Sequence, residues 1–430
     1  MEKLVIRGGR PLRGTVAVAG SKNAALPIMA ACLLADEPVI LENVPHLADV
    51  ETLTQLLDGL GLASIRLPTG AIHLQVNDSS RCEADADLVR RMRASFCVLG
   101  PLVAKRGHAR VALPGGCKIG DRPVDLHLKG LAALGADITI ENDQVTARAR
   151  KLRGAAINLT GERGTTVTGT CNVMSAAVLA EGDTMIDGAA REPEVIDLGR
   201  FLGELGAQID GLGTSRIHIR GVRQLSGGYY SIIPDRIEAA TLMTAAAVTR
   251  GELKLTNIRR TQLTAVIAKL RHVGLTIDGD RNTLAVHGDR PLRATDLDTA
   301  PYPGVPTDVQ AQLTALLSLA AGTSRIRDHV FPDRFHHLAE LRRMGAQIRQ
   351  HDNEATVTGV RSLHSAEVTA TDLRASAALL LAALAARGET TLRQIYHLDR
   401  GYEQLDEKLR SVGAEIRRVA DEAIPERRAA

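Results

Sequence analysis

Leu134-Gly135-Ala-Asp-Ile138 is one of six similar stretches that decide the fold of this 430-residue chain. In each stretch a large apolar residue precedes a glycine, and a short strand-like segment follows. The other five stretches are centred on Gly61, Gly206, Gly274, Gly345 and Gly413. Successive glycines are 74, 71, 68, 71 and 68 residues apart, and this even spacing indicates an internal structural repeat.

Each of these glycines follows apolar residues at helical spacing, as in Leu338-Ala-Glu-Leu-Arg-Arg-Met344. A glycine in this place is typical of the residue just past a helix end, where a positive φ is needed. A second pattern, an alanine-rich helix followed by a polar turn and a strand, also occurs once per repeat, for example at 246–255. We therefore predict two helices and several strands in each repeat.

The length of the chain favours two or three domains. Six repeats group most simply as three plus three, with a boundary near Gly227-Gly228-Tyr229-Tyr230, where two glycines interrupt the pattern. We predict two similar lobes with a cleft between them, because small-molecule sites favour domain interfaces.

The composition excludes several classes of function. Hydrophobic residues make up 44% of the chain and charged residues 24%, as in a folded soluble protein. Aromatic content of 2% leaves few platforms for stacking bases, and a net charge of +3 gives no general attraction to a polyanion. Residues 1–7 lack the apolar core of a signal peptide, and the longest apolar stretch, 375–386, is too short to span a bilayer. We expect a cytoplasmic protein with no nucleic-acid or membrane partner.

The five cysteines lack the paired spacings of a disulfide framework or a metal knuckle. Cys32, Cys97 and Cys171 lie in helix-like apolar contexts and are expected to be buried, and Cys82 is expected at the surface or in a turn. Cys117 differs, because it lies among glycines with Lys118 and Arg122 nearby, and cations lower the pKa of a thiol. A reactive loop thiol and a small buried side chain are equally good interpretations.

Lys22 and Asn23 stand where a strand gives way to a helix, a position that can bind an anion. The alternative is simple helix capping beside a solvated lysine. Arginines at positions outside the repeat pattern suit carboxylates and phosphates and together predict a doubly anionic substrate. Asp308 follows a turn-rich segment and can act as a base in a cleft, or can simply cap the helix that starts at Val309.

Taken together, these segments resemble the bacterial UDP-N-acetylglucosamine enolpyruvyl transferase family, from about residue 3 to about residue 418. The resemblance is carried by the motifs Pro114-Gly-Gly-Cys117, Ile119-Gly-Asp-Arg122-Pro-Val-Asp125-Leu-His127, Arg191-Glu-Pro-Glu194, Pro306-Thr-Asp-Val-Gln-Ala-Gln312 and Ala370-Thr-Asp-Leu-Arg-Ala-Ser376. The sister family that acts on shikimate phosphate shares the repeat but lacks this cysteine loop.

The resemblance implies an α/β fold, a two-lobed inside-out barrel of six βαβαββ repeats, three in each lobe. The C-terminal lobe would comprise 1–20 and 230–430, including the first strand, and the N-terminal lobe 21–229 with the Cys117 loop. The implied reaction moves the enolpyruvyl group of phosphoenolpyruvate to the 3-hydroxyl of UDP-N-acetylglucosamine and releases phosphate, the first committed step of peptidoglycan precursor synthesis. No metal, organic cofactor or obligate protein partner is implied.

The resemblance also assigns residues to roles. Cys117 would protonate the methylene carbon of phosphoenolpyruvate and form a covalent adduct, Asp308 would take the proton of the sugar hydroxyl, and the Cys117 loop would close over the site. Lys22 and Arg400 complete the implied catalytic set. Phosphoenolpyruvate would be bound by Lys22, Asn23, Arg93, Arg122, Arg334, Asp372, Arg374 and Arg400. UDP-N-acetylglucosamine would be bound by Asn23, Arg93, Arg122, Pro123, Val124, Asp125, Leu126, Thr166, Val167, Asp308 and Val330.

One region departs from the family pattern, since Thr168 stands where many members have glycine and Cys171 where an acidic residue is frequent. This departure supports the alternative of a non-catalytic paralogue that binds a UDP-sugar. A transferase that uses another nucleoside acceptor is a separate alternative. Cys117 further predicts inactivation by fosfomycin, an epoxide that alkylates this thiol in the family. The polar tail from Arg417 to Ala430 is expected to be poorly ordered.

Overall fold

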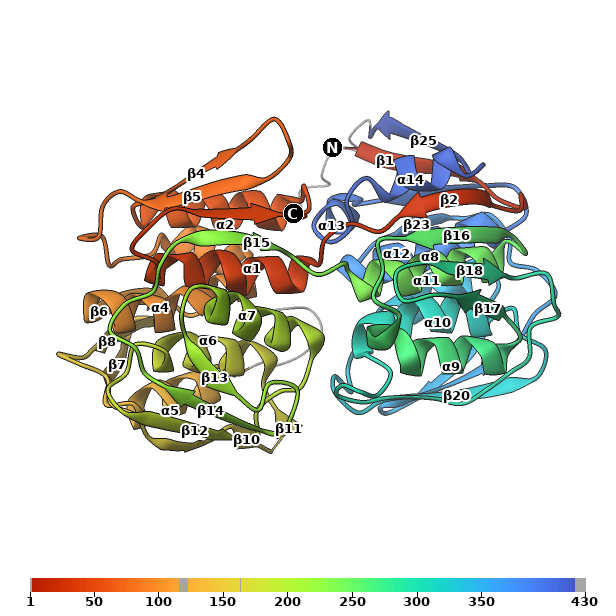
Figure 1. Cartoon of the computed structure of the whole chain (residues 1–430). Coiled ribbons are helices and arrows are strands. Elements are labelled where there is room, and N and C mark those ends of the chain that lie inside the picture. The colour runs from red at the N-terminus through yellow and green to blue at the C-terminus, as the bar shows by residue number, and fades with distance from the viewer. Residues whose placement is uncertain (1, 116–122, 163, 422–430) are drawn as a thin grey trace, which may run out of the picture. The chain divides into compact units, whose positions relative to one another are not determined.

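The computed structural model describes residues 2–115, 123–162 and 164–421 (Figure 1). Their contacts divide the chain into two compact units, which we call the C-terminal unit (2–18 and 236–421) and the N-terminal unit (the described residues of 19–235). We expected the divisions after residues 20 and 229. The second lies six residues later because β15 (Gly228–Ser231) pairs in parallel with β3 (Val39–Glu42) and so completes a sheet of the N-terminal unit.

The predicted unit of helix, glycine and strand is present six times. The six glycines have φ values of 80°, 95°, 104°, 124°, 89° and 105° in chain order. The helices that precede them are α2 (Ala48–Gly59), α5 (Asp125–Ala133), α7 (Pro193–Glu204), α9 (Thr264–Val273), α11 (His337–Arg343) and α14 (Leu405–Ser411). The strands that follow are β4 (Leu62–Arg66), β7 (Asp137–Glu141), β13 (Gln208–Asp210), β17 (Thr276–Gly279), β21 (Gln347–His351) and β25 (Glu415–Ala420). This part of the sequence prediction is confirmed.

The repeats build six small sheets on one plan. The strand after the alanine-rich helix has an antiparallel neighbour in all six sheets. In five of them a parallel strand lies on its other side, and in the three-stranded sheet it is the edge strand, His108–Ala112. In the N-terminal unit the further strands are β5 (Ile72–Val76), β6 (His108–Ala112), β8 (Gln144–Arg148), β9 (Ala156–Asn158), β12 (Asp183–Asp187) and β14 (Arg216–Arg220). In the C-terminal unit they are β2 (Arg13–Ala17), β16 (Glu252–Thr256), β18 (Leu284–His287), β19 (Leu297–Thr299), β20 (Thr323–Asp328), β22 (Glu354–Thr358), β23 (Glu367–Thr369) and β24 (Glu389–Arg393).

The sheet of the last repeat is completed by the start of the chain. β1 (Glu2–Arg7) lies between β24 and β25 and pairs antiparallel with both, so that Ile6 faces Thr390 on one side and Ile416 on the other. Leu4 and Ile6 are fully buried there. The first and last strands of the chain are therefore neighbours in one sheet of the C-terminal unit.

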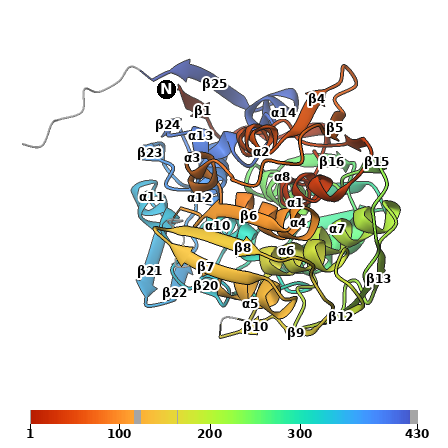
Figure 2. The same ribbon diagram turned by 90° about the vertical axis from the view of Figure 1, so that its left-hand side faces the viewer.

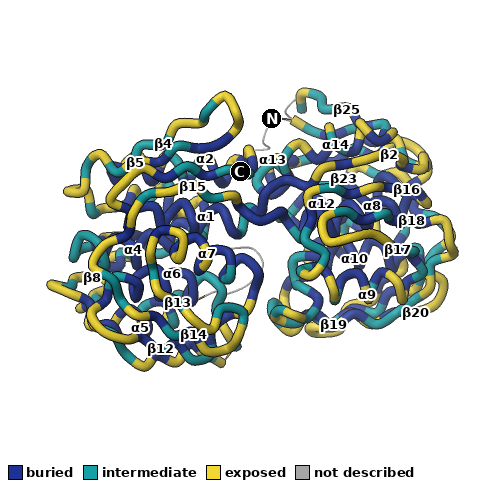
Figure 3. Tube along the Cα trace, in the orientation of Figure 1, coloured by how far each residue is buried: buried dark blue, intermediate teal, exposed yellow. Residues whose placement is uncertain are grey.

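Each unit encloses a set of helices most of whose residues are buried (Figure 3). In the C-terminal unit these are α8 (Arg236–Val248), α10 (Gln310–Leu317) and α12 (Leu373–Ala385), which contact one another. In the N-terminal unit they are α1 (Lys22–Ala31), α4 (Leu99–Arg106) and α6 (Val167–Ala177), with β4, β5, β7, β8 and β12 around them (Figure 2). Alanine and leucine on every face suit a helix with no solvent side. This arrangement of helices inside and sheets outside confirms the predicted α/β fold.

The remaining short elements connect these layers. They are η1 (Cys32–Leu34), α3 (Ala86–Arg91), η2 (Arg93–Val98), β10 (Thr160–Gly161), β11 (Gly164–Thr165), η3 (Arg260–Leu263), η4 (Thr307–Val309) and α13 (Tyr396–Asp399). None of the helices in the described part of the chain is both long and apolar enough to cross a lipid bilayer.

Candidate active site

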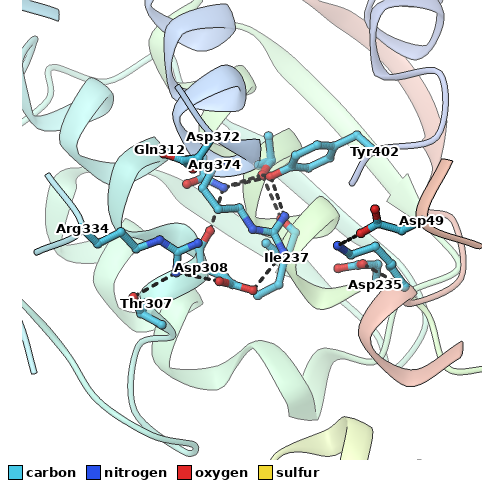
Figure 4. A network of polar contacts seen from close by, with 12 residues as sticks. Asp49, Asp235, Ile237, Thr307, Asp308, Gln312, Arg334, Asp372, Arg374 and Tyr402 are labelled. Carbon is cyan, nitrogen blue, oxygen red and sulfur yellow. Dashed lines mark hydrogen bonds and ion pairs between the residues drawn. The ribbon is translucent and has the colours of Figure 1, made fainter. Parts of the chain in front are cut away.

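Asp308 lies between two buried arginines in the C-terminal unit (Figure 4). Its Oδ1 accepts a hydrogen bond of 2.7 Å from a terminal nitrogen of Arg334, and its Oδ2 accepts one of 2.9 Å from Arg374. The arginine side chains are 6% and 3% exposed, whereas that of Asp308 is 26% exposed. The buried guanidinium groups of Arg334 and Arg374 therefore bind the carboxylate of Asp308, which is partly exposed to solvent.

The structure excludes one of the two interpretations of Asp308, that of a helix cap. The residue before α10 is Val309, and Asp308 itself lies inside η4, so it is not the cap of either helix. Burial raises the pKa of Asp308, but the charges of Arg374 and Arg334 and their hydrogen bonds lower it by more. The net result is a pKa well below the usual range. Asp308 is therefore ionised at neutral pH, and the three side chains together keep a net positive charge that attracts anions.

Buried polar side chains next to Arg374 form a hydrogen-bonded cluster (Figure 4). The Tyr402 hydroxyl lies 3.1 Å from a terminal nitrogen of Arg374, 3.0 Å from Gln312 Nε2 and 3.0 Å from Thr241 Oγ1. Gln312 also donates to the main-chain oxygen of Asp308 at 2.9 Å. The three inner helices α8, α10 and α12 thus each contribute one polar side chain to a single buried cluster.

Asp372 and His337 lie close to the same arginines. The Asp372 carboxylate caps α12 by accepting hydrogen bonds from the main-chain nitrogens of Arg374 at 2.8 Å and Ala375 at 3.1 Å. Burial raises the pKa of Asp372, but these bonds and the charge of Arg334 outweigh it and lower the pKa overall. Burial lowers the pKa of His337 to about 4, so this imidazole is neutral at pH 7.

Lys22 is the first residue of α1 in the N-terminal unit. Its Nζ donates to Asp49 Oδ2 at 2.9 Å, and its side chain is only 11% exposed. The main-chain nitrogen of Lys22 faces the Asp235 carboxylate at 3.4 Å, and Ser21 makes no side-chain cap bond. The alternative of a solvated lysine beside a capping residue is therefore wrong, and Lys22 is held in place by a buried acid.

The residues expected to bind the nucleotide sugar lie mostly at the starts of α5 and α6. Arg93 donates to the carbonyl oxygen of Pro123 at 3.2 Å, and Asp125 opens α5. Thr166 caps α6 by accepting from Gly169 N at 3.1 Å, and Val167 follows it. Three of the remaining expected residues lie at helix ends: Asn23 in the first turn of α1, Val124 at the cap of α5 and Arg400 at the end of α13. The Leu126 side chain packs against Gly161, and the Val330 N–H donates to Asp328 at 3.0 Å. Cys117 and Arg122 lie outside the described residues.

Thr168, the departure from the family pattern, is part of a hydrogen-bond chain whose protons can be assigned. Asn172 Oδ1 accepts from Gly100 N at 2.6 Å, so its Nδ2 faces His127 Nδ1 at 3.1 Å. That nitrogen must accept, which leaves the proton of a neutral ring on Nε2, 3.1 Å from Thr168 Oγ1. Thr168 therefore accepts from His127 and keeps its own hydroxyl proton for another group.

The other thiols behave as expected. Cys32, Cys97 and Cys171 are buried, and burial raises the pKa of all three, to about 12 for Cys97. Cys82 is partly exposed, and its pKa is also raised by burial. None of these four is an activated nucleophile. Within residues 2–115, 123–162 and 164–421, no group of three or more His, Cys, Asp or Glu side chains is arranged to hold a metal ion.

Sequence reasoning missed Asp49, Thr241, Gln312 and Tyr402. All four are buried, and each has a hydrogen-bond partner at least 27 positions away, such as Thr241 and Tyr402, which are 161 positions apart. Tyr402 carried the best available signal, because the chain has only five tyrosines and this one follows Arg400 by two residues.

Comparisons with known proteins identify relatives of this chain. The family model described as EPSP synthase (3-phosphoshikimate 1-carboxyvinyltransferase) matches residues 6–409. UDP-N-acetylglucosamine 1-carboxyvinyltransferase of Methylacidiphilum infernorum is 50% identical over 419 residues, 97% of this chain and 99% of that protein. UDP-N-acetylglucosamine 1-carboxyvinyltransferase 1 of Caldanaerobacter subterraneus subsp. tengcongensis is 49% identical over 416 residues, again 97% and 99% of the two chains.

A solved structure of an enolpyruvyl transferase has the same fold as this chain. The enolpyruvyl transferase NikO from Streptomyces tendae matches with a TM-score of 0.89 at 28% sequence identity, covering 98% of this chain and 99% of that one. The family model and the full-length relatives lead to one conclusion: the chain belongs to the EPSP synthase family and, within it, to the UDP-N-acetylglucosamine 1-carboxyvinyltransferases.

Proposed function

We propose that this chain transfers the enolpyruvyl group of phosphoenolpyruvate to the 3-hydroxyl of UDP-N-acetylglucosamine and releases phosphate. This is the first committed step of peptidoglycan precursor synthesis. The observation that carries the proposal is the ionised Asp308 between the buried cations of Arg334 and Arg374, in a chain about half identical to enzymes named for this reaction. Such a site combines a base with donors for a doubly anionic substrate.

The reaction would proceed by addition and elimination. The oxygen of the sugar hydroxyl attacks C2 of phosphoenolpyruvate while its proton passes to Asp308, and the methylene carbon C3 takes a proton from Cys117. In the tetrahedral product of this addition, C3 returns a proton to the Cys117 thiolate while the bond from C2 to the phosphate oxygen breaks, and the released phosphate takes up the proton held by Asp308. The products are the enolpyruvyl ether and inorganic phosphate, so no oxidant or reductant is needed.

The low pKa of Asp308 places a requirement on this mechanism. A carboxylate held by two arginines is a weak base, because proton transfer is most effective when the pKa of the base is near the working pH. Bound substrate would supply competing acceptors, the carboxylate and phosphate oxygens of phosphoenolpyruvate. Arg334 and Arg374 then share their donors with the substrate, their hold on Asp308 weakens, and its pKa rises when the base is needed.

The anionic substrate would be bound by the residues that the family resemblance assigns to it. We assign phosphate and carboxylate binding to Lys22, Asn23, Arg93, Arg122, Arg334, Asp372, Arg374 and Arg400. In this scheme Asp49 holds Lys22 in place, and Asp372 orients Arg374 through the start of α12. Fixed cations that meet a developing negative charge are usually the largest contribution to catalysis of this kind. We also propose that the enzyme acts in the cytoplasm, where phosphoenolpyruvate is made.

The nucleotide sugar would lie along the starts of α5 and α6. We assign its contacts to Asn23, Arg93, Arg122, Pro123, Val124, Asp125, Leu126, Thr166, Val167, Asp308 and Val330. In this scheme the Thr168 hydroxyl adds a donor that a glycine would lack, since its oxygen already accepts from His127. We propose that the departure from the family pattern leaves UDP-N-acetylglucosamine as the acceptor.

The decisive experiment is phosphate release by the purified chain with phosphoenolpyruvate, in the presence and absence of UDP-N-acetylglucosamine. Release should depend on the acceptor and be lost or severely reduced in Cys117→Ser and Asp308→Ala. Cys82→Ser is the matched control, because it changes a partly exposed thiol that has no proposed role. Acceptor binding without release would favour the non-catalytic paralogue, and neither binding nor release would direct the search to other nucleoside acceptors.

A further inference from the structure

Tyr402 is a buried residue with no proposed substrate contact, yet it joins most of the polar groups around Asp308. It lies between α13 and α14 and is 2% exposed. Its hydroxyl is within hydrogen-bond distance of Arg374, Gln312 and Thr241, and all four residues belong to the C-terminal unit. Figure 4 shows the hydroxyl directed into this cluster.

The direction of each hydrogen bond follows from counting protons. Thr241 donates its single hydroxyl proton to the carbonyl oxygen of Ile237 at 2.9 Å, one helical turn earlier. Thr241 then has lone pairs left for the proton of Tyr402 at 3.0 Å and for Gln312 Nε2 at 3.2 Å, and the Tyr402 oxygen presents lone pairs to Arg374 and Gln312. Those lone pairs accept from Arg374 at 3.1 Å and from Gln312 at 3.0 Å.

The guanidinium of Arg374 is consequently held at two places by one side chain. One terminal nitrogen donates to the Tyr402 hydroxyl, and the carbon at the centre of the group lies 5.4 Å from the centroid of the Tyr402 ring. The other terminal nitrogen is then directed at Asp308, 2.9 Å from Oδ2. Because the guanidinium group is planar and rigid, fixing one terminal nitrogen also restricts the position of the other.

Gln312 applies the same restraint to the main chain of Asp308. Its amide nitrogen donates to the Asp308 carbonyl oxygen at 2.9 Å and lies 3.0 Å from the Tyr402 hydroxyl and 3.2 Å from Thr241 Oγ1. The backbone of Asp308, through Gln312, and its carboxylate, through Arg374, are therefore both linked to Tyr402. Polar networks of this kind in a buried site are stiff, because an unpaired member would be costly.

We infer that Tyr402 is a positioning residue for the reaction, which acts through Arg374 on Asp308. The inference rests on the proposed function, since it gives Asp308 and Arg374 their roles. The hydroxyl carries the effect, and the ring provides the packing surface. Tyr402→Phe separates the two, because it keeps the ring over Arg374 and removes the only acceptor that Tyr402 offers.

The test is a double-mutant cycle of Tyr402→Phe with Arg374→Met, measured as kcat/KM for phosphoenolpyruvate. Loss of one hydrogen bond to a charged group predicts a decrease of about tenfold when Arg374 is present. If Tyr402 acts through Arg374, the same change should have less than about a twofold effect in the Arg374→Met background. An equal decrease in both backgrounds, or no decrease in either, would overturn the inference.

A matched control is available in the N-terminal unit. The Tyr230 hydroxyl donates to the buried carboxylate of Asp197 at 2.8 Å, so Tyr230→Phe also removes a tyrosine hydroxyl with a buried partner. It should change kcat/KM by the same factor in both backgrounds. If Tyr402→Phe does not fold, Thr241→Val replaces it in the cycle, because that change removes the acceptor of the Tyr402 proton and leaves the tyrosine in place.

A cycle that needs no turnover distinguishes failure of this inference from failure of the proposed function. The same four proteins are unfolded in urea at pH 7, and the unfolding equilibrium constants are compared. Tyr402→Phe should raise that constant about tenfold more with Arg374 present than without it. If Tyr402 and Arg374 are coupled in unfolding but the chain shows no acceptor-dependent phosphate release, the proposed function is wrong and the contact between the two residues is real. If the enzyme is active but the two residues are not coupled, only the inference about Tyr402 is wrong.

Discussion

Gly61 and Gly135 end equivalent helices, but the structure predicts very different costs for a methyl group at the two positions. Both have a positive φ, 80° at Gly61 and 95° at Gly135. A Cβ on Gly135 would meet nothing within 4 Å, whereas a Cβ on Gly61 would lie 2.1 Å from the carbonyl oxygen of Asp78. That oxygen cannot move cheaply, because the main-chain nitrogens of Asn77 and Asp78 donate to the Gly61 carbonyl at 2.9 and 3.1 Å.

The two contributions can be estimated separately. Gly135→Ala has only the penalty of a left-handed backbone for a residue with a Cβ, about 1–2 kcal/mol. Gly61→Ala adds displacement of a neighbouring main chain, for which overpacking costs of about 1–3 kcal/mol are typical, so the total is roughly 2–5 kcal/mol. Gly59→Ala is the control, because Gly59 lies in α2 with open space around its Cβ. It should be neutral or stabilise the protein by up to about 1 kcal/mol.

The measurement is urea unfolding followed by far-ultraviolet circular dichroism, which suits a chain without tryptophan. The midpoints should decrease in the order Gly59→Ala, Gly135→Ala, Gly61→Ala, with unchanged slopes. Equal midpoints for Gly61→Ala and Gly135→Ala would show that the loop at Asp78 yields freely. The explanation by steric overlap would then be wrong, although the requirement for a positive φ would stand.

Three further predictions concern the site. Asp308→Asn should reduce kcat by a factor of about 10²–10⁴. Because the pKa of Asp308 is lowered in the folded state, its ionised carboxylate should stabilise the fold above about pH 4, and this stabilisation should disappear as the pH falls further. The difference between wild type and variant in urea unfolding should therefore vanish in acid. Thr168→Val should raise KM for UDP-N-acetylglucosamine about threefold to tenfold at unchanged kcat, the value of one hydrogen bond, and an unchanged KM would remove Thr168 from the proposed contacts. Fosfomycin should inactivate the enzyme by modifying Cys117 alone, and mass spectrometry that finds the adduct on Cys82 instead would contradict the assignment.

The fold was largely predictable because its signal is local and repeated. Each of the six helices ends at a glycine that needs a positive φ, and these glycines recur at almost constant spacing along the sequence. The boundary after residue 229 could not be placed correctly from local pattern. Gly228–Ser231 belongs to the N-terminal unit only because it pairs with Val39–Glu42, almost 190 residues earlier.

The site was predictable only in part. Asp308, Lys22 and the arginines stood out because they interrupt the repeat or match family motifs, and the structure brings Asp308, Arg334 and Arg374 into direct contact. The residues that hold them could not be found in this way. Asp49 resembles any acid in the first turn of a helix, and its burial against Lys22 is visible only in three dimensions.

The pairing of β1 with the last strands of the chain has a consequence for synthesis on the ribosome. All strands of the three N-terminal sheets, including β15, are complete by residue 231, so this unit can assemble while translation continues. Arg7, by contrast, pairs with Glu389 and Glu415, which are synthesised about 20 to 80 s later at typical rates of about 5–20 residues per second. During that interval Leu4 and Ile6 lack their sheet partners, and chaperones that recognise short apolar segments have a defined time in which to bind the nascent N-terminus.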